Sequence, residues 1–298
     1  MSASKQIGSS ELILNSDGSI YHLALKPHEV ADTIINVGDP ARVKLVSDFF
    51  DKVEFKREKR EFITHTGVYK GIPMSVISTG IGTDNIDIVY NELDALANID
   101  LETRVQKEAH RQLSFIRIGT TGSLQEEIKP DTAVSSEFGL GLDGLMLHYE
   151  FENDEDEKQL INAFRSHFPG NLELPHPYIF GSSGMISDMF NSILPKGITA
   201  SCQGFYGPQG RVLRLNPRFP DLIRNLNSFS SEGHRIINFE METSAMFGLA
   251  KLLGHDCCSI NLVVANRITN EVSRSYTSSM QQTIELVLES IHKKTRES

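Results

Sequence analysis

The chain has 298 residues, of which 39% are hydrophobic and 23% are charged, a balance typical of a globular protein and not of a disordered or fibrous one. Its formal net charge of -10 argues against nonspecific binding to nucleic acid or anionic lipid, because the field of the protein repels both. Three cysteines without disulfide or metal spacing favour a reducing compartment. No apolar stretch is long enough for a signal peptide or a membrane span, so we expect a soluble, cytoplasmic protein.

Strand-like and helix-like segments alternate after a polar N-terminus. Residues 1–20 are rich in glycine and serine, and we expect a flexible arm there, followed by a single domain over residues 21–298. In chain order we predict a strand within 33–40, a helix over 41–50, a strand within 73–82, a helix over 84–99, strands within 113–122, 132–139 and 235–242, a helix over 241–254 stopped by Gly254, a strand within 257–267 and a helix over 278–294. This alternation predicts a sheet covered by helices on both faces.

Two charged segments interrupt the alternation. Residues 101–113, LETRVQKEAHRQL, are helix-prone, and residues 151–159, FENDEDEKQ, form an acidic run. For both segments we expect a solvated helix or loop face rather than a binding site, since runs of charge usually remain in water.

Arg117 lies in the middle of an apolar, strand-like run, FIRIGTTG, at residues 115–122. An unpaired charge is costly to bury, so this arginine either reaches solvent at a strand end or meets an anion at the edge of the sheet. Two more turns follow strand-like runs, VGDPAR at 37–42 and STGIGTDN at 78–85. Ligands of open α/β sheets bind beyond the carboxyl ends of strands, so the three glycine turns together predict an oxyanion site. The GIG turn is not a complete GxGxxG motif, and a GxxxxGKS/T motif is absent, which argues against dinucleotide and triphosphate folds.

The chain resembles the nucleoside phosphorylase-I family, and within it most closely the uridine phosphorylase branch. The motifs YHLAL, VGDPAR, REF, STGIG, RIGTTG, FYGPQGR, FEMET and VVANRIT occur in the family's order and cover roughly residues 20–295. The resemblance implies a three-layer α/β/α sandwich with a central mixed β-sheet. It also implies active sites shared between the subunits of a homodimer, which assembles into a homohexamer in bacterial members.

The resemblance implies a phosphate site with three arginines. Arg42 and Arg117 would bind phosphate together with Arg60 of the neighbouring subunit, a backbone N–H of Gly38 and the hydroxyl of Thr120. The planar guanidinium fork matches phosphate oxygens, which suits this residue type. Each arginine alone could instead form a surface ion pair, but the set favours anion binding.

The ribose site implied by the resemblance is centred on NFEMET. Glu242 would accept the 2′-hydroxyl, Met241 would pack against the sugar, and Glu240 would support them. His22 of YHLAL would reach the 5′-hydroxyl from the adjacent subunit. Both glutamates could also serve as N-terminal charges of the helix predicted over 241–254, a role compatible with ribose binding.

The base site implied by the resemblance lies in FYGPQGR. Gln209 and Arg211 match the pair that reads uracil, and Phe205 would stack on the ring. Gln209 can offer a donor to O2 and an acceptor to N3–H, while Arg211 donates toward O4. Cytosine has an amino donor in place of O4, so two donors would face each other and cytidine would be rejected.

Purine-specific relatives place an aspartate in the late strand–loop, where this sequence has Asn266 and Arg267. This departure favours a pyrimidine base. Arg267 either supports the base pocket from behind or forms a structural ion pair.

The activity implied by the resemblance is reversible phosphorolysis of uridine to uracil and ribose 1-phosphate, a step of pyrimidine salvage. Arg42, Arg117, Arg211 and Glu242 would be the catalytic residues, with inorganic phosphate as co-substrate and no organic cofactor. Alternatives are a purine nucleoside phosphorylase, a nucleosidase of the same fold, or a catalytically silent protein that binds nucleosides. The three arginines argue against a hydrolase, which needs no phosphate.

Relatives also hold a potassium ion at the dimer interface. The matching positions are Glu61, the carbonyl group of Ile81, and Asn85 in place of a serine. An asparagine oxygen can ligate such an ion, so the resemblance implies a K⁺ site here.

Overall fold

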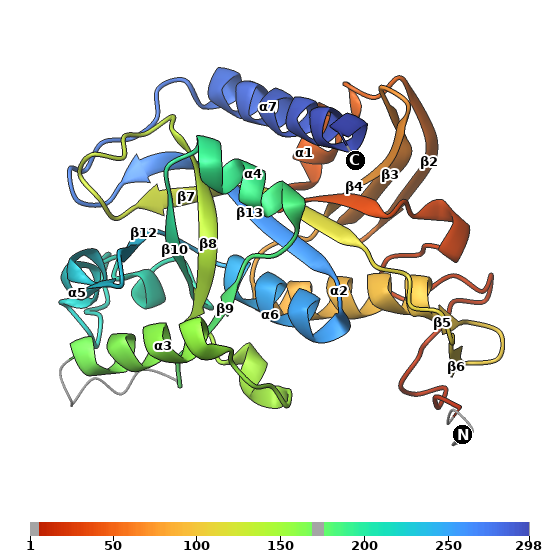
Figure 1. Ribbon diagram of the computed structural model, residues 1–298, viewed down its shortest axis with the longest axis horizontal. Coiled ribbons are helices and arrows are strands. Elements are labelled where there is room, and N and C mark those ends of the chain that lie inside the picture. Colours follow the sequence, from red (N-terminus) through yellow and green to blue (C-terminus); the bar gives the residue numbers. More distant parts are fainter. Residues whose placement is uncertain (1–5, 169–175, 298) are drawn as a thin grey trace.

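The fold is a mixed β-sheet covered by helices on both faces (Figure 1). The computed structural model describes residues 6–168 and 176–297. The strands of the large sheet are β1 Thr33–Val37, β2 Lys52–Lys59, β3 Phe62–Tyr69, β4 Ile72–Ser78, β7 Ser114–Ser123, β8 Ala133–Gly141, β9 Tyr178–Gly181, β10 Lys196–Ser201, β11 Ser230–Ser231, β12 His234–Glu240 and β13 Asp256–Asn266. A separate two-stranded sheet contains β5 Ile99–Asp100 and β6 Val105–Gln106.

The large sheet closes on itself in one half. Its order is β11-β12-β10-β8-β13-β7-β1-β4-β3-β2, with β9 paired to β8. Strand β7 is parallel to β1 and β13, whereas β8 is antiparallel to β13, so the sheet is mixed. Strand β12 pairs both with β10 and with β7, which makes a closed ring of β12, β10, β8, β13 and β7. This ring brings the ends of β7 and β12 together.

Helices form the two outer layers. One face carries α1 Pro40–Ser47, α4 Met185–Ile193 and α7 Tyr276–Glu297, and the other carries α2 Thr83–Asn98 and α6 Thr243–Leu253 (Figure 1). Helices α3 Glu155–His167 and α5 Leu222–Ser228 pack against the ring strands, and the short helices are η1 Pro27–Glu29, η2 Leu145–His148 and η3 Gly207–Gln209. These layers confirm the predicted α/β/α sandwich with a central mixed sheet. Of the helices described, none has both the length and the apolar character to cross a membrane.

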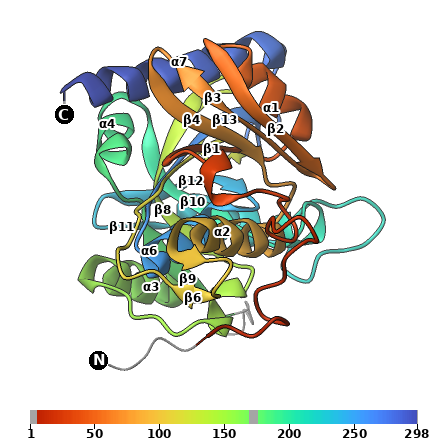
Figure 2. The ribbon, with the colours of Figure 1, turned by 90° about the vertical axis from the view of Figure 1, so that its right-hand side faces the viewer.

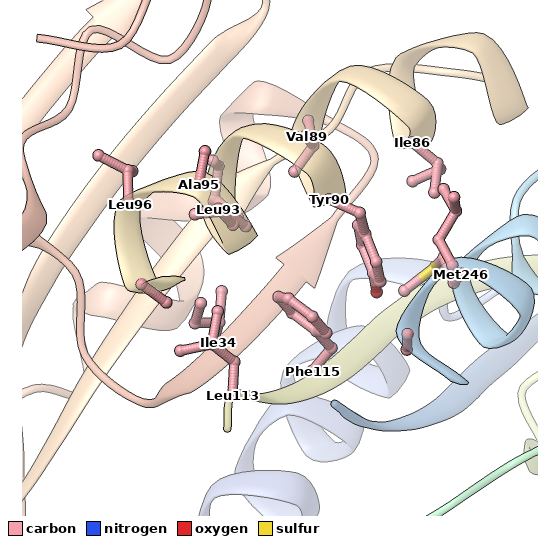
Figure 3. Packing of buried hydrophobic residues seen from close by; sticks show 14 of the residues in the cluster. Ile34, Ile86, Val89, Tyr90, Leu93, Ala95, Leu96, Leu113, Phe115 and Met246 are labelled. Carbon is pink, nitrogen blue, oxygen red and sulfur yellow. The ribbon is translucent and has the colours of Figure 1, made fainter. Parts of the chain in front are cut away.

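Helix α2 shows how the apolar pattern becomes a core (Figure 3). Its buried side chains recur at helical spacing and therefore share one face: Ile86, Val89, Tyr90, Leu93 and Leu96. They belong to one buried cluster with Ile34 of β1, Phe115 of β7 and Met246 of α6. Burial of each large apolar side chain contributes about 1.5–3 kcal/mol, so this face holds the helix against the sheet.

Helix α6 ends as predicted and begins slightly later. Gly254, with a φ of 75°, is its left-handed C-cap, a conformation that glycine adopts without steric cost. The helix starts at Thr243 rather than at Met241, because Glu242 is the N-cap and Glu240 accepts hydrogen bonds from the N–H groups of Glu242 and Thr243. The two acidic residues therefore stand just before the helix.

Residues 101–113 do not form the helix that their composition allows. The Asp100 side chain accepts hydrogen bonds from the N–H groups of Glu102 and Thr103, and Arg104 adopts a φ of 59°. This turn lets β6 pair with β5. Aspartate side chains compete with helical hydrogen bonding in this way, so the local turn prevails over helix propensity.

The acidic run at 151–159 is only partly solvated. Asp154 and Glu157 form a capping box that starts α3, in which each side chain accepts the other's backbone N–H. Glu157 is buried, accepts from the Gly181 N–H and pairs with Lys251. The expectation of a solvated face is therefore wrong for Glu157, because a cation and two N–H groups compensate its burial.

The N-terminal segment lies against the body of the protein. Leu12 and Ile20 are buried in the same cluster as α2, and the Ile7 N–H donates to the Arg104 carbonyl oxygen. Residues 1–5 of the expected arm lie outside the described residues. We propose that residues 21–298 form a single domain, and the continuity of the large sheet supports this.

Gly139 of β8 allows α6 to approach the sheet. A Cβ atom at this position would lie 2.8 Å from Ser244 Cα and 3.0 Å from the Thr243 carbonyl oxygen, both in the backbone of α6. We expect Gly139→Ala to lower the free energy of unfolding by about 1–3 kcal/mol, because the helix must move. Urea denaturation measures this loss. Gly8→Ala is the control, since Gly8 is exposed and its Cβ would meet only the flexible Glu11 side chain, at 3.4 Å. Equal stability of both variants would contradict the tight contact.

Candidate active site

A cavity of about 800 Å³ lies where the strand-ending turns meet. Gly38 follows β1, Gly80 follows β4, and Gly122 lies near the end of β7, and all three line it. The cavity brings together residues predicted for phosphate (Gly38, Arg42, Arg117, Thr120), for ribose (Glu240, Met241, Glu242), for the base (Phe205, Gln209, Arg211) and for potassium (Glu61, Ile81, Asn85). Ligands of α/β sheets bind at such strand ends, so this cavity is the candidate active site.

Arg117 forms a buried ion cluster with two glutamates. Its Nη2 atom lies 2.5 Å from Glu242 Oε2 and 3.2 Å from Glu240 Oε2, and Nη1 donates to the Asn261 side-chain oxygen. All three side chains are buried, with at most 8% of their surface exposed. Carboxylates of this chain, and not only an anionic ligand, therefore explain how an arginine is tolerated within an apolar strand.

Burial and charge act in opposite directions in this cluster. Burial by itself lowers the pKa of Arg117, but Glu240 and Glu242 reverse the effect and raise that pKa above its usual value. Burial raises the pKa of Glu242, and Arg117 opposes that rise. The charges of Arg117 and Glu242 therefore stabilise each other.

The two glutamates have different surroundings. Glu240 accepts from the Glu242 and Thr243 N–H groups and from the Ser201 hydroxyl, so its oxygens are occupied by the helix and the sheet. Glu242 Oε1 accepts from the Gly82 N–H at 2.7 Å, at the start of α2. Glu242 thus connects the turn after β4 to the turn after β12.

The predicted base-binding residues form a connected group. Arg211 Cζ lies 3.7 Å from the centroid of the Phe205 ring, and Arg211 Nη1 donates to Gln209 Oε1 at 2.5 Å. Both terminal nitrogens of Arg267 donate to the Gln209 carbonyl oxygen at 3.2 Å. Burial, with a contribution from the charge of Arg267, lowers the pKa of Arg211 to about 10, so Arg211 is still a cation at neutral pH.

A second cavity, of about 730 Å³, lies beyond Arg211 beneath the loop between β10 and α5. This loop, turquoise in Figure 2, extends from the body of the protein. The residues that line this second cavity include Leu142, Cys202, Pro208 and Leu222. The walls of the second cavity are mainly apolar, whereas the two glutamates and the arginines Arg42 and Arg117 line the first cavity. We therefore place the chemistry in the first cavity.

His22 and Arg60, expected from a neighbouring subunit, are not among the described residues that line this chain's own cavity. His22 Nδ1 lies 2.7 Å from Glu92 Oε1. Arg60 occupies the turn between β2 and β3 with a φ of 57°. Sequence reasoning missed Asn261, which bonds Arg117, and Tyr276, which bonds Arg42, because no local motif marks either residue.

The three residues expected at a potassium ion all line the cavity. Asn85 Nδ2 donates to Glu61 Oε1 at 3.2 Å. A cation between them would require the amide to turn its oxygen inward. The carboxylate and amide oxygens are donors that suit a hard cation.

A separate group, Asp94, His110 and His255, has the composition of a metal site. The Leu113 N–H donates to His255 Nδ1, so in the neutral ring the proton lies on Nε2, which faces Asp94 at 3.1 Å. A metal ion would need the lone pair of that same Nε2 atom. The geometry therefore favours a hydrogen-bonded structural group.

The sequence pattern of the phosphorylase superfamily matches residues 32–295. The chain belongs to this superfamily. Its similarity to the uridine phosphorylase of Thermococcus kodakarensis is 33% identity over 90% of this chain and 84% of that protein. A solved structure, titled as a Trypanosoma brucei nucleoside phosphorylase that shows uridine phosphorylase activity, has a TM-score of 0.84 and 31% identity and covers 95% of this chain and 99% of that one. A purine nucleoside phosphorylase of Alkaliphilus metalliredigens is 26% identical over 83% of this chain and 88% of that protein.

For this phosphorylase superfamily member, we expect Arg117→Met to leave two buried carboxylates uncompensated. A carboxyl group whose pKa is raised on folding stabilises the folded state in acid, and that contribution is lost as the pH rises through the folded pKa. The variant should therefore lose about 3–5 kcal/mol of unfolding free energy near neutral pH and less near about pH 5.

Urea unfolding at both pH values measures this difference. The double variant Arg117→Met with Glu242→Gln should recover part of the loss, since one buried charge is gone. A loss independent of pH would mean that the ion cluster does not control stability.

Proposed function

We propose that this protein is a uridine phosphorylase, which converts uridine and inorganic phosphate reversibly into uracil and ribose 1-phosphate. The observation that carries the proposal is one cavity that contains Arg42, the pairing of Arg117 with Glu240 and Glu242, and the contact of Gln209 with Arg211. Such a cavity offers sites for an anion, a sugar and a base with carbonyl groups. The similarity to a uridine phosphorylase and to a structure titled with that activity supports the substrate.

The phosphate would occupy the end nearest the strand turns. Arg42, Arg117 and Thr120 are the donors there, and Gly38 adds a backbone N–H. A Cβ at Gly38 would lie 3.3 Å from the Gly80 carbonyl oxygen, so glycine lets the two turns approach closely. Guanidinium groups match phosphate oxygens in geometry and charge, which positions the nucleophile.

The ribose would lie against Met241 and Glu242. Glu242 Oε1 and Oε2 are bonded to the Gly82 N–H and to Arg117, and each carboxylate oxygen has a second lone pair for a sugar hydroxyl. We propose that Glu242 accepts the 2′-hydroxyl and that Glu240, whose oxygens are occupied by the start of α6, holds this region in place.

The base would be read by Gln209 and Arg211 with Phe205 beside the ring. Cleavage of the C1′–N bond leaves positive charge on the sugar and negative charge on the base. A cationic Arg211 near O4 stabilises the charge on the base, and phosphate approaches C1′ from the other side. Phosphate is thus a co-substrate, and the reaction needs no organic cofactor.

Asn266 is the residue that disfavours a purine substrate. Its side-chain oxygen accepts from the Ile268 and Thr269 N–H groups, and its nitrogen donates to the carbonyl oxygens of Gln125 and Ile128. Every polar atom of this amide is therefore bonded to backbone groups, partly of its own loop and partly of the segment that follows β7. This supports a structural role at the position where purine-specific members have an acid.

The assembly we propose is a homodimer with shared active sites, in which His22 and Arg60 of one subunit complete the cavity of the other, with a hexamer as a further level. We also propose a cytoplasmic location. A K⁺ ion could be held by Glu61, Ile81 and Asn85, where it would join the subunits without taking part in the chemistry.

The decisive assay is uracil release from uridine by the purified protein, with and without phosphate, and with inosine in parallel. We expect uracil only when phosphate is present, and no cleavage of inosine. Cleavage without phosphate would indicate a nucleosidase, cleavage of inosine would contradict the base site, and no cleavage at all would favour a silent binding protein.

We expect Arg211→Ala to cost about 1–3 kcal/mol or more of transition-state stabilisation for uridine, because a half-buried cationic donor is removed. The comparison of kcat/KM with that of the unaltered enzyme measures the loss. Arg214→Ala is the matched control, since Arg214 is an exposed arginine of the same loop and lies outside the first cavity. An unchanged rate for Arg211→Ala would contradict the proposed base contact.

A further inference from the structure

Arg42 and Arg117 face the same cavity but have different partners. Arg117 is paired with two carboxylates, whereas Arg42 Nη1 donates to the Ile118 carbonyl oxygen at 3.2 Å and Nη2 donates to the Tyr276 hydroxyl at 3.0 Å. Within residues 6–168 and 176–297, no carboxylate pairs with Arg42, although this residue is only 6% exposed. Arg42 is therefore a buried cation held by two neutral oxygens.

Neutral acceptors orient a guanidinium group without cancelling its charge. The group has five N–H donors in one plane, and two contacts on one side leave the others available to the cavity. A carboxylate in place of the Tyr276 hydroxyl would satisfy the same nitrogen but would also offset the positive charge that an anionic substrate needs.

Tyr276 is itself held by two parts of the fold. It is the first residue of α7, whose Met280 and Ile284 lie in one buried cluster with Val43 and Val46 of α1, the helix that carries Arg42. The segment before it is tied to β13, because Val272 bridges Ala265 and the Ser273 N–H donates to the Val264 carbonyl oxygen. Helix α7 lies on the same face of the sheet as α1 (Figure 1), and the hydroxyl of its first residue accepts from Arg42.

We propose that Tyr276 is a positioning residue that holds the Arg42 guanidinium in the orientation that binds inorganic phosphate. The inference rests on the proposed phosphorolysis for its kinetic consequences. Tyr276 is far in sequence from the motifs that contribute to the phosphate site, VGDPAR and RIGTTG. The role is therefore inferred from the contact between Tyr276 and Arg42 in this structure.

The first test is Tyr276→Phe, which removes the hydroxyl and keeps the ring. We expect the KM for phosphate to rise roughly threefold to tenfold, while the KM for uridine changes by less than about twofold. Tyr69→Phe is the matched control, because the Tyr69 hydroxyl also bonds α7, through Glu289 at 2.8 Å, and Tyr69 lies outside the cavity. A phosphate KM unchanged in Tyr276→Phe, or raised equally by Tyr69→Phe, would overturn the proposal.

The second test is Tyr276→Glu, which places a carboxylate against Arg42. Phosphate should bind more weakly than in Tyr276→Phe, because the charge of Arg42 is then partly neutralised. Phosphate affinity equal to that of the unaltered protein would contradict the role of the neutral acceptor.

Titration with inorganic phosphate in the absence of nucleoside, followed by the shift in melting temperature, separates this inference from the proposed function. One outcome is that the unaltered protein cleaves no uridine, while phosphate raises its melting temperature more than it raises that of Tyr276→Phe. This result would support the positioning of Arg42 and contradict the proposed function. The opposite outcome is that the unaltered protein cleaves uridine, while phosphate shifts the melting temperature equally in the unaltered protein and in Tyr276→Phe. This result would contradict the inference and leave the proposed function in place.

Discussion

The ion cluster of Arg117, Glu240 and Glu242 is the constraint on which the candidate site depends. It joins the middle of β7, the end of β12 and the start of α6. Buried charges are tolerated only when their remaining donors and acceptors are satisfied, and here Asn261, Ser201, the Gly82 N–H and the first N–H groups of α6 fulfil that requirement. A shift of one strand relative to the other would leave at least one charge unpaired. The cluster thus fixes how the two strand ends meet.

The closed half of the sheet is what makes this meeting possible. Strand β12 reaches β7 because the ring β12, β10, β8, β13 and β7 closes, with Phe239 opposite Gly122. The same closure carries Gln209 and Arg211 to the cavity, since their loop follows β10, the neighbour of β12. The open half supplies the turns after β1 and β4. The cavity lies where the open and closed halves of one sheet join.

Arg42 and Arg117, which both line the cavity, differ in how far their charges are compensated. Arg117 is paired with Glu240 and Glu242, and its charge opposes the rise that burial causes in the pKa of Glu242. Arg42 keeps its charge because its acceptors are a carbonyl oxygen and a phenol. An anion that enters the cavity consequently meets one cation that is already compensated and one that is not. This asymmetry gives the phosphate a preferred end of the site.

Short-range patterns in the sequence determined much of this protein. Helical spacing predicted α2 and α7, Gly254 predicted the end of α6, and the glycine turns after strand-like runs predicted where a ligand site would form. These features depend on residues a few positions apart, which is why the sequence alone reveals them. The composition of residues 101–113 allows a helix or a loop, and the Asp100 side chain favours the turn because it competes for the backbone N–H groups of Glu102 and Thr103. Only the tertiary structure decided which partners the polar side chains take: the glutamates that pair with Arg117, the phenol that bonds Arg42, and the carbonyl oxygens of Gln125 and Ile128 that bond Asn266. Residues far apart in the chain make these contacts, and their free energy comes from burial, which exists only once the sheet has closed.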